Sequence, residues 1–251
     1  MLNLLCEMFN EDDFMGNKTK DKSALDAYHE GTDYQFDTKE LTLGPWTSYS
    51  LIHDPKHMCF VLSRYKFCAK MLDGKKTVME VGSGDGFGLP IIAQIAEKVY
   101  AVDWDERLLE GNARRLSHLK NVTYIKIDLN ESSPDIIVDA AFSIDVLEHL
   151  ELKNEDNFLR NIIKCLKPQG VLITGTPNIS ATHYATPRSQ VQHINLKSLT
   201  SLKELMERYF ENVFMFGMND EVLHTGYGPM CHYIWSIGVG VKPEIHPDIK
   251  K

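Results

Sequence analysis

The sequence predicts an α/β fold in which a largely parallel sheet carries helices on both faces. From residue 77 onward, short β-branched runs alternate with amphipathic stretches of 10 to 15 residues, which is typical of right-handed β–α–β units. A glycine-rich run follows the first of these strands, and acidic residues follow the next two. Because ligands of such sheets bind at the carboxyl ends of the strands, a ligand site is expected there.

The alternation allows each element to be placed in order. Strands are expected at 77–81, 98–103, 122–128, 139–145, 170–177, 212–218 and 232–242, and helices at 87–97, 105–119, 153–166 and 196–210. No helix separates the last two strands, so we expect them to pair antiparallel at one edge of the sheet.

The region before the first strand is expected to form a cap. Residues 1–40 are polar and acidic and are expected to be mobile or loosely packed. Residues 43–57 are rich in turn-forming and aromatic residues, and the apolar spacing over 58–72 predicts a helix with Asp54-Pro55 at its start. The predicted organisation is a cap or lid at 1–75, a sheet domain at 76–242 and a C-terminal tail at 243–251.

Composition excludes several classes of protein. The chain has 27 Lys and Arg against 35 Asp and Glu, and a net charge of −8 disfavours non-specific nucleic-acid binding. It contains no apolar run of the ~18 residues that cross a bilayer, and its start lacks the basic leader of a signal peptide. The five cysteines are scattered without a C-x-x-C pair, which favours reduced thiols in the cytoplasm over disulfides or a zinc site.

The stretch VMEVGSGDGFG places glycines at every second position from Gly82 to Gly88. Glycine allows unusual backbone angles and a close approach of the backbone to a ligand. A dinucleotide fingerprint, G-x-G-x-x-G, would need a third glycine where Phe87 or Leu89 stands, so the run does not fit a nicotinamide oxidoreductase.

The spacing Glu80-x-Gly82-x-Gly84-x-Gly86 resembles the first motif of class I S-adenosylmethionine-dependent methyltransferases. The segments VDWD, KIDLNE, SIDVLEHL and LKPQG follow in order and extend the resemblance over residues 78–177. It implies a Rossmann-like sheet of seven strands in the order 3-2-1-4-5-7-6, with strand 7 antiparallel and an N-terminal helical cap. It also implies S-adenosyl-L-methionine as the methyl donor.

Each strand end offers groups suited to part of this cofactor. Its ammonium and sulfonium favour a nearby carboxylate such as Glu80 or Asp85. Asp103 can accept hydrogen bonds from both ribose hydroxyls while Trp104 lies against the adenine, and Asp128 can accept from the exocyclic amine. The predicted cofactor-binding residues are Glu80, Gly82, Ser83, Gly84, Gly86, Asp103, Trp104, Asp128, Leu129 and Asp145.

The methyl acceptor is expected beyond the fourth and fifth strands. Residues 176–199 form a long connection after the fifth strand, and long ordered loops at this end of a sheet usually serve function. No acidic residue occurs between Asn157 and Lys203, which favours an anionic acceptor, although two of the lysines suit the end of a helix by themselves. The basic residues of this stretch are Arg160, Lys164, Lys167, Arg188, Lys197 and Lys203.

If the acceptor is a hydroxyl, the enzyme must align it and remove its proton. His193 is our first choice as general base, because the pKa of a histidine lies near working pH; its alternative is to cap the helix at 196–210. His149 in VLEHL is the second candidate, and Arg188 is expected to bind the anion. Asp145 is expected to shape the pocket. Weaker candidates are His183, His224 and Tyr227.

The cap contributes further aromatic residues, with Trp46 and Tyr49 expected either to close over the cofactor or to pack the cap on the sheet. His53 and His57 are four residues apart and would chelate a metal ion on one helix, but Pro55 lies between them and no carboxylate pair adjoins them. The sequence therefore predicts no metal site.

The loop and the stretch HTGYGPM also resemble methyltransferases that modify bacterial capsule and other surface polysaccharides. The predicted function is O-methylation of a small phosphate-, nucleotide- or sugar-linked acceptor in surface polysaccharide biosynthesis. The expected partner is thus an anionic small molecule, with neither nucleic acid nor membrane, in the cytoplasm. The alternatives are a small-molecule N-methyltransferase, or a methyltransferase-like module that binds the cofactor without catalysis.

Overall fold

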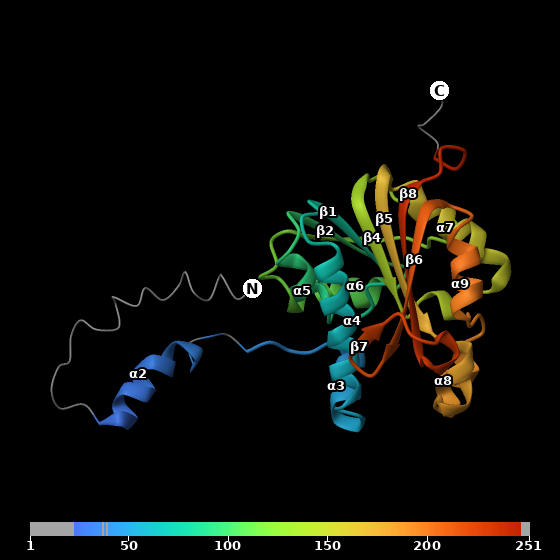
Figure 1. Cartoon of the computed structure of the whole chain (residues 1–251). Coiled ribbons are helices and arrows are strands. Elements are labelled where there is room, and N and C mark those ends of the chain that lie inside the picture. Colours follow the sequence, from blue (N-terminus) through green and yellow to red (C-terminus); the bar gives the residue numbers. More distant parts are fainter. Residues whose placement is uncertain (1–22, 37, 39, 247–251) are drawn as a thin grey trace. The chain divides into compact units, whose positions relative to one another are not determined.

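The computed structural model describes residues 23–246 except 37 and 39; the predictions for 1–22 and for 247–251 lie outside the described residues. Its contacts divide the chain between Leu41 and Thr42. In the described part of the first unit, α2 (Ala24–Phe36) is a helix. All that follows concerns the second unit, from Thr42 onward (Figure 1).

The second unit is built on one mixed sheet. Its strands are β1 (Thr77–Val81), β2 (Lys98–Asp103), β3 (Val122–Lys126), β4 (Val138–Ile144), β5 (Leu166–Pro177), β6 (Phe210–Asn219), β7 (Val222–His224) and β8 (Tyr233–Val241). They lie in the order β3-β2-β1-β4-β5-β8-β6-β7. The first five are parallel, and β8 is antiparallel to both β5 and β6.

This order confirms the predicted fold, with β8 in the place of the expected strand 7, and it adds one strand. The extra strand β7 pairs antiparallel with the end of β6. Asp220 turns the chain between them with a φ of +50°, a left-handed conformation that short polar side chains tolerate. The short hairpin lies at the edge of the sheet.

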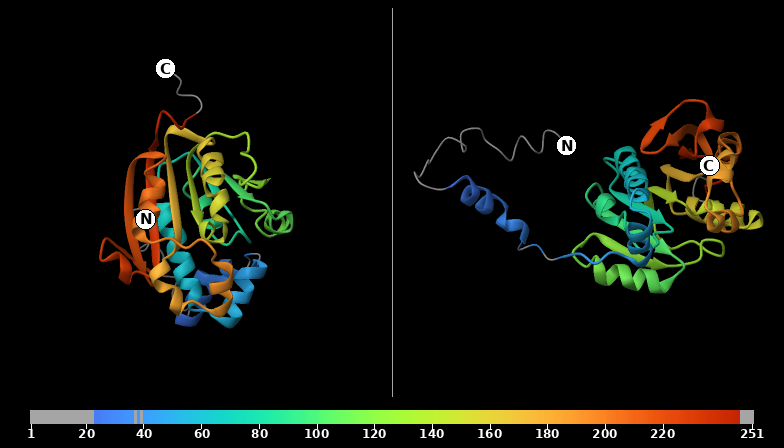
Figure 2. Two further views of the ribbon diagram at one scale, coloured as in Figure 1. Left: turned by 90° about the vertical axis from the view of Figure 1, so that its right-hand side faces the viewer. Right: turned by 90° about the horizontal axis from the view of Figure 1, so that it is seen from below.

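Helices cover both faces of the sheet (Figure 2). They are α3 (Pro45–His53), α4 (His57–Met71), α5 (Leu89–Ala93), α6 (Glu106–Arg115), α7 (Glu155–Ile163), α8 (Pro187–Gln192) and α9 (Leu199–Met206), with 3-10 turns η2 (Leu147–His149), η3 (Leu152–Asn154), η4 (Ile179–Tyr184) and η5 (Gly228–Met230). In one buried cluster α4 and α5 meet the sheet, and in another α7 and α9 do. No helix of the described part is long and apolar enough to span a membrane.

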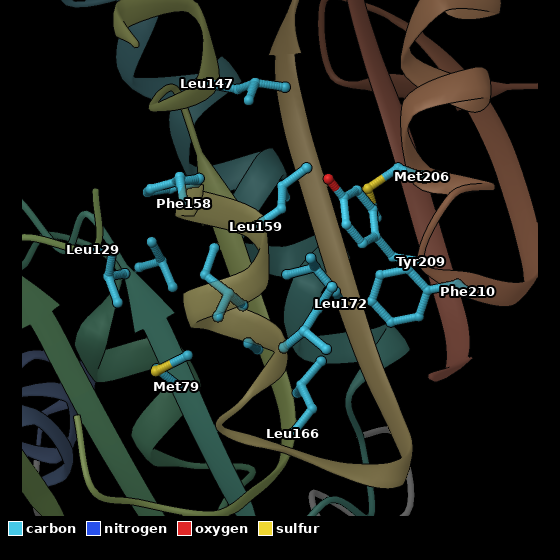
Figure 3. Packing of buried hydrophobic residues seen from close by; sticks show 14 of the residues in the cluster. Met79, Leu129, Leu147, Phe158, Leu159, Leu166, Leu172, Met206, Tyr209 and Phe210 are labelled. Atoms are coloured by element: carbon cyan, nitrogen blue, oxygen red, sulfur yellow. The ribbon is translucent and has the colours of Figure 1, made fainter. Parts of the chain in front are cut away.

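Successive side chains of each strand point to opposite faces of the sheet and so contribute to two hydrophobic cores. In β1, Val78 joins the cluster under α4 and α5, and Met79 joins the cluster under α7 and α9. Figure 3 shows the second cluster, in which Phe158 and Leu159 of α7 pack near Leu172 of β5. Full burial of such a side chain is worth about 1.5–3 kcal/mol. These contacts hold the carboxyl ends of the strands in fixed positions.

The structure corrects two predictions about the cap. The stretch 43–57, read as turn-rich, contains the helix α3. Asp54 does not cap the helix that follows: it is the C-cap of α3, and α4 begins after Lys56. The chain turns tightly between the two helices, where the His57 amide donates to the Asp54 carbonyl over 3.1 Å. Proline at 55 fits such a turn and separates the helices.

Candidate active site

A cavity of about 1280 Å³ opens at the carboxyl ends of the parallel strands. Helices α3 and α8 both lie at this end of the sheet (Figures 1 and 2). Residues from the strand ends, from α3 and from α8 share its lining. Small-molecule sites commonly occupy about 300–1,000 Å³, so the cavity has room for a nucleoside cofactor together with a second molecule.

The glycine run is held in the backbone conformation that glycine favours. Gly82, Gly84 and Gly86 have φ angles of +71°, +52° and +75°. A Cβ at Gly82 would lie 2.3 Å from a methyl group of Val146, so the loop passes too close to the η2 segment for any side chain. Asn112 of α6 donates from Nδ2 to the Gly84 carbonyl over 2.8 Å and fixes the loop from behind.

Several predicted cofactor residues meet in the cavity, as expected from the strand order. Asp103, Trp104, Asp128 and Leu129 follow β2 and β3, and all four line the cavity together with Gly82. Asp103 accepts from the Gly84 amide and from the Asp105 amide, each over 2.9 Å. One lone pair remains on each of its oxygens for a ligand. Of the other predicted residues, Asp145 lines the cavity, whereas Glu80, Ser83, Gly84 and Gly86 do not.

Glu80 lies in β1 beneath the glycine run and is 1% exposed. Tyr65 of α4 donates to its Oε1 over 3.0 Å, whereas Oε2 has no hydrogen-bond partner among the described residues. Burial raises the pKa of Glu80 to about 8. The hydrogen bond from Tyr65 lowers this pKa, and the charges of Asp103 and Asp85 raise it further. Glu80 therefore retains a proton near neutral pH in the absence of a cation.

We expect Glu80 to make the folded state less stable as pH rises. Its folded pKa is about 8 and that of an ordinary glutamate about 4.5, so the unfolded chain releases a proton that the folded chain keeps. The stabilisation is present below pH ~4.5 and is lost as pH rises toward 8. In Glu80→Gln, the free energy of unfolding without ligand should depend less on pH. At pH 8 it should exceed that of the unsubstituted protein by several kcal/mol, as measured by thermal unfolding. If the free energy of unfolding changed with pH equally in the two proteins, the raised pKa assigned to Glu80 would be wrong.

Asp85, the other carboxylate expected near the cofactor, serves the cap instead. Its Oδ2 accepts from the Thr47 amide over 2.7 Å, and its Oδ1 accepts from the Thr47 hydroxyl over 3.1 Å. No side chain caps α3 locally, so Asp85 satisfies a donor of its first turn. A Cβ at Gly44 would lie 2.3 Å from Oδ2, so glycine there allows α3 to dock on the glycine loop.

The aromatic residues of α3 face the cavity. Trp46 lies against Gly84, where a Cβ would meet its ring at 2.8 Å, and Tyr49 stacks on His53 with ring centroids 4.0 Å apart. Trp46, Tyr49, His53 and His57 all line the cavity. His53 ends α3 and His57 begins α4, so the two do not form an i, i+4 pair on one helix.

Asp145 is held in a strained conformation at the end of β4, with a φ of +55°. Its Oδ2 forms a 2.6 Å ion pair with Arg64 of α4, whose guanidinium lies over the ring of Tyr233, 3.9 Å from its centroid. Burial lowers the pKa of Arg64, but the charge of Asp145, the Asp145 hydrogen bond and the charges of Tyr233 and Glu148 together outweigh it and raise the pKa. Sequence reasoning missed Arg64, although an arginine on the apolar side of the helix at 58–72 was a usable signal.

The two histidines singled out from the sequence lie side by side. His149 ends η2 and lines the cavity; His193 follows α8, one residue beyond the lining residue Gln192. Their rings are 5.1 Å apart and edge-on. Burial, and then the charge of His149, lower the pKa of His193, so it is a neutral imidazole at pH 7. His193 does not cap the following helix, because Ser198 does.

Most of the basic residues between 157 and 203 are engaged away from the cavity. Two pair with carboxylates four residues away in the sequence, two pair with carboxylates of other segments, and Lys164 donates to Asn161. Arg188 of α8 lines the cavity and has no carboxylate partner among the residues that the structure describes. The anionic-acceptor hypothesis therefore depends on Arg188. The paired residues are Arg160, Lys167, Lys197 and Lys203.

The weaker catalytic candidates fall outside the lining of the cavity. His183 packs on Tyr184 with ring centroids 3.8 Å apart. His224 contacts the Asn219 side chain over 2.8 Å in the β6–β7 hairpin, and Tyr227 is exposed. Their positions give them no direct route to a cofactor in the cavity.

Comparison with known proteins agrees with this geometry. A family model described as a methyltransferase domain matches residues 53–213. A "Probable S-adenosylmethionine-dependent methyltransferase" of Mycobacterium tuberculosis is 32% identical over 148 residues, 57% of this chain and 52% of the relative. A ubiquinone biosynthesis O-methyltransferase of Rickettsia conorii is 27% identical over 111 residues, 44% and 38% of the two chains. The chain thus spans about half, or less, of these curated relatives.

Solved structures show the same fold. The methyltransferase domain of bacterial CtHen1-C superposes with a TM-score of 0.61 at 20% identity, covering 72% of this chain and 99% of that one. The N-methyltransferase NodS of Bradyrhizobium japonicum, in complex with S-adenosylhomocysteine, gives 0.56 at 14% identity, covering 84% and 97%.

The strand order is that of the class I, S-adenosylmethionine-dependent methyltransferase fold, and the cavity lies at the carboxyl ends of its parallel strands. This chain belongs to the methyltransferase-domain family, and S-adenosyl-L-methionine is its cofactor. The residues fit that cofactor: a glycine loop that passes close to the cavity, a carboxylate with free lone pairs after β2, and a buried glutamate without a partner for one oxygen.

Proposed function

We propose that this chain transfers the methyl group of S-adenosyl-L-methionine to an oxygen atom of a small anionic acceptor. The observation that carries the proposal is a single cavity. Asp103 and Asp128 lie at its cofactor end, and His149 and Arg188 also line it. A sulfonium methyl group is already activated, so the protein has to align the acceptor, exclude water and activate the acceptor hydroxyl. His149 lines the cavity and His193 lies beside it, which supports a role for one of these imidazoles in activating that hydroxyl.

The acceptor is proposed to be anionic because of Arg188. Its guanidinium belongs to the cavity lining, and a planar guanidinium suits phosphate or carboxylate through paired hydrogen bonds. Transfer to oxygen is favoured over transfer to an amine, since an anion-binding site with adjacent imidazoles suits a hydroxyl that must lose a proton. The relatives include both kinds of enzyme by name: a ubiquinone biosynthesis O-methyltransferase and, from wheat, a phosphoethanolamine N-methyltransferase.

Within this proposal the acceptor is phosphate-, nucleotide- or sugar-linked and belongs to capsule or other surface polysaccharide biosynthesis in the cytoplasm. The support is the sequence resemblance of the loop at 176–199 and of HTGYGPM, together with the position of Arg188. An N-methylated small molecule is the alternative, and it would be recognised by product analysis.

The experiment is a transfer assay with labelled S-adenosylmethionine and a panel of sugar phosphates, nucleotide sugars, their neutral counterparts and amines. We expect label on an oxygen of an anionic acceptor. Arg188→Ala should raise KM for that acceptor about tenfold to a hundredfold, the equivalent of one hydrogen bond to a charged group. Lys203→Ala, which breaks an ion pair with Glu207 outside the cavity, is the control and should leave KM unchanged.

Two results would contradict the proposal. One is preferential methylation of a neutral or amine acceptor. The other is an unchanged KM in Arg188→Ala for an anionic acceptor that the enzyme does use.

A further inference from the structure

Three side chains at the acceptor side of the cavity form a cluster with the composition of a metal site. Glu148 and His149 lie in η2, and His193 lies at the end of α8. One ligand atom from each side chain falls within 4.8 Å of the other two. Two imidazoles and one carboxylate are the donors of many catalytic zinc and iron sites, in which further positions stay open for a substrate.

The environment of Glu148 is a second indication of a bound ligand, separate from the distances within the cluster. Its side chain is 0% exposed. The Thr176 hydroxyl donates to Oε2 over 3.0 Å, but Oε1 has no hydrogen-bond partner among the described residues. A buried polar oxygen without a partner is costly. Burial, and then the charge of Asp145, raise the pKa of Glu148, so this carboxyl, like that of Glu80, is charged at neutral pH only beside a cation.

The hydrogen bonds around the cluster orient the ligand atoms. Nδ1 of His149 lies 3.1 Å from the carbonyl oxygen of Gln192. A carbonyl only accepts, so Nδ1 carries the proton and the lone pair is on Nε2. Metal-binding histidines commonly donate their second ring N–H to a carbonyl or carboxylate in this way. The Asn195 amide donates to the Glu148 carbonyl over 3.0 Å and ties the segment after α8 to η2.

We propose that Glu148, His149 and His193 bind a divalent transition-metal ion beside the methyl acceptor. Mixed nitrogen and oxygen donors favour ions from Mn²⁺ to Zn²⁺ over Mg²⁺, which prefers oxygen. Ligand atoms around such ions lie about 3–4 Å apart, given metal–ligand distances near 2.1 Å. Small rotations of exposed His149 and half-buried His193 achieve this while Glu148 stays in place. Asp145 lies near Glu148 and His193, and its charge is balanced by the ion pair with Arg64.

This inference rests on the proposed function and specifies how the acceptor is activated. An ion held by Glu148, His149 and His193 would lower the pKa of an acceptor hydroxyl bound at an open position, and the hydroxyl proton would pass to water. The alkoxide oxygen attacks the methyl carbon, and a new C–O bond forms. The C–S bond breaks with its electron pair returning to sulfur, which leaves neutral S-adenosylhomocysteine. No oxidant or reductant is needed. In the alternative without an ion, His193 takes the proton directly.

The test is equilibrium dialysis of the untagged full chain, stripped with a chelator, against Co²⁺ and Zn²⁺, with the visible spectrum of bound Co²⁺ as a second readout. We expect one ion per chain. His149→Ala and His193→Ala should each weaken binding about tenfold or more, and Glu148→Gln should do so if it folds. His118→Ala removes an exposed histidine near the end of α6, outside the cluster, and should leave binding unchanged.

Failure of this inference is distinguishable from failure of the proposed function. Calorimetry with S-adenosylhomocysteine on the same stripped protein reports cofactor binding without the ion. If the chain binds the cofactor and methylates an acceptor in chelator but binds no ion, the metal proposal is overturned and direct proton transfer to His193 stands. Ion binding that persists in the double variant of His149 and His193 also overturns it. Ion binding without methyl transfer would overturn the proposed function alone.

Discussion

Replacing Asp103 by alanine is expected to abolish most of the affinity for the cofactor, by a factor of at least about a hundred. A carboxylate that accepts two ribose hydroxyls contributes about 1.5–3 kcal/mol for each hydrogen bond, and 1.4 kcal/mol corresponds to a factor of ten. Asp103 also accepts from the Gly84 amide, so its loss releases the glycine loop as well. Calorimetry with S-adenosylhomocysteine measures the effect.

Asp139 provides the matched control for this prediction. It lies in β4 at the opposite end of the sheet, where its carboxylate accepts from the amides of Lys76 and Thr77 at the start of β1. Asp139→Ala should lower the melting temperature through the loss of these hydrogen bonds and leave cofactor affinity unchanged. Equal losses of affinity in both variants would mean that Asp103 acts through general stability. Affinity retained in Asp103→Ala would place the nucleoside elsewhere.

The second large effect is expected from His193→Ala, which should lower kcat about a hundredfold to ten-thousandfold. Affinity for S-adenosylhomocysteine should stay within about twofold, because His193 is outside the cavity lining and the cofactor residues are untouched. The loss is expected whether the imidazole takes the acceptor proton itself or helps to hold an ion that lowers the pKa of the acceptor hydroxyl. Single-turnover transfer to the best acceptor, with saturating cofactor, measures it.

Val191→Ala is the control for disturbance of the loop. Val191 belongs to the same short helix, two residues before His193, and is 78% exposed. It should retain activity. Normal turnover in His193→Ala would show that neither form of activation passes through this side chain, and His149 would then carry the step alone.

The cofactor half of the site follows from local sequence. A parallel strand order brings the residues after β1, β2 and β3 to one edge, and glycines at alternate positions adopt positive φ wherever the strand must bend sharply. Asp103, Asp128 and Leu129 therefore lie where the order of motifs predicts them. These contacts involve short spans of chain, and the same spacing in another chain would give the same arrangement.

The cap and the acceptor side were less predictable, because distant residues fix them. Helix α3 has no local side-chain cap and depends on Asp85, 38 residues further on, which bonds the Thr47 amide and hydroxyl. The composition of residues 43–57 does not predict those hydrogen bonds, because their acceptor lies outside the segment. The basic bias of 157–203 was misleading for a partly local reason. Arg160 and Lys203 pair with carboxylates four residues away in the sequence, whereas Lys167 and Lys197 pair with Asp139 and Glu155 of other segments.

The family resemblance implied the order of the strands. By itself, the sequence determined the class of fold, its seven principal strands, the glycine loop and the carboxylates near the carboxyl ends of β2 and β3. Those features depend on periodicity and on short-range spacing, which the chain carries from residue to residue. Only the tertiary structure decided that Arg188 alone of its basic stretch reaches the cavity. It also decided that Arg64 holds Asp145, and that His193 meets His149 and Glu148. These juxtapositions form between distant segments when both faces of the sheet are packed, and no local pattern encodes them.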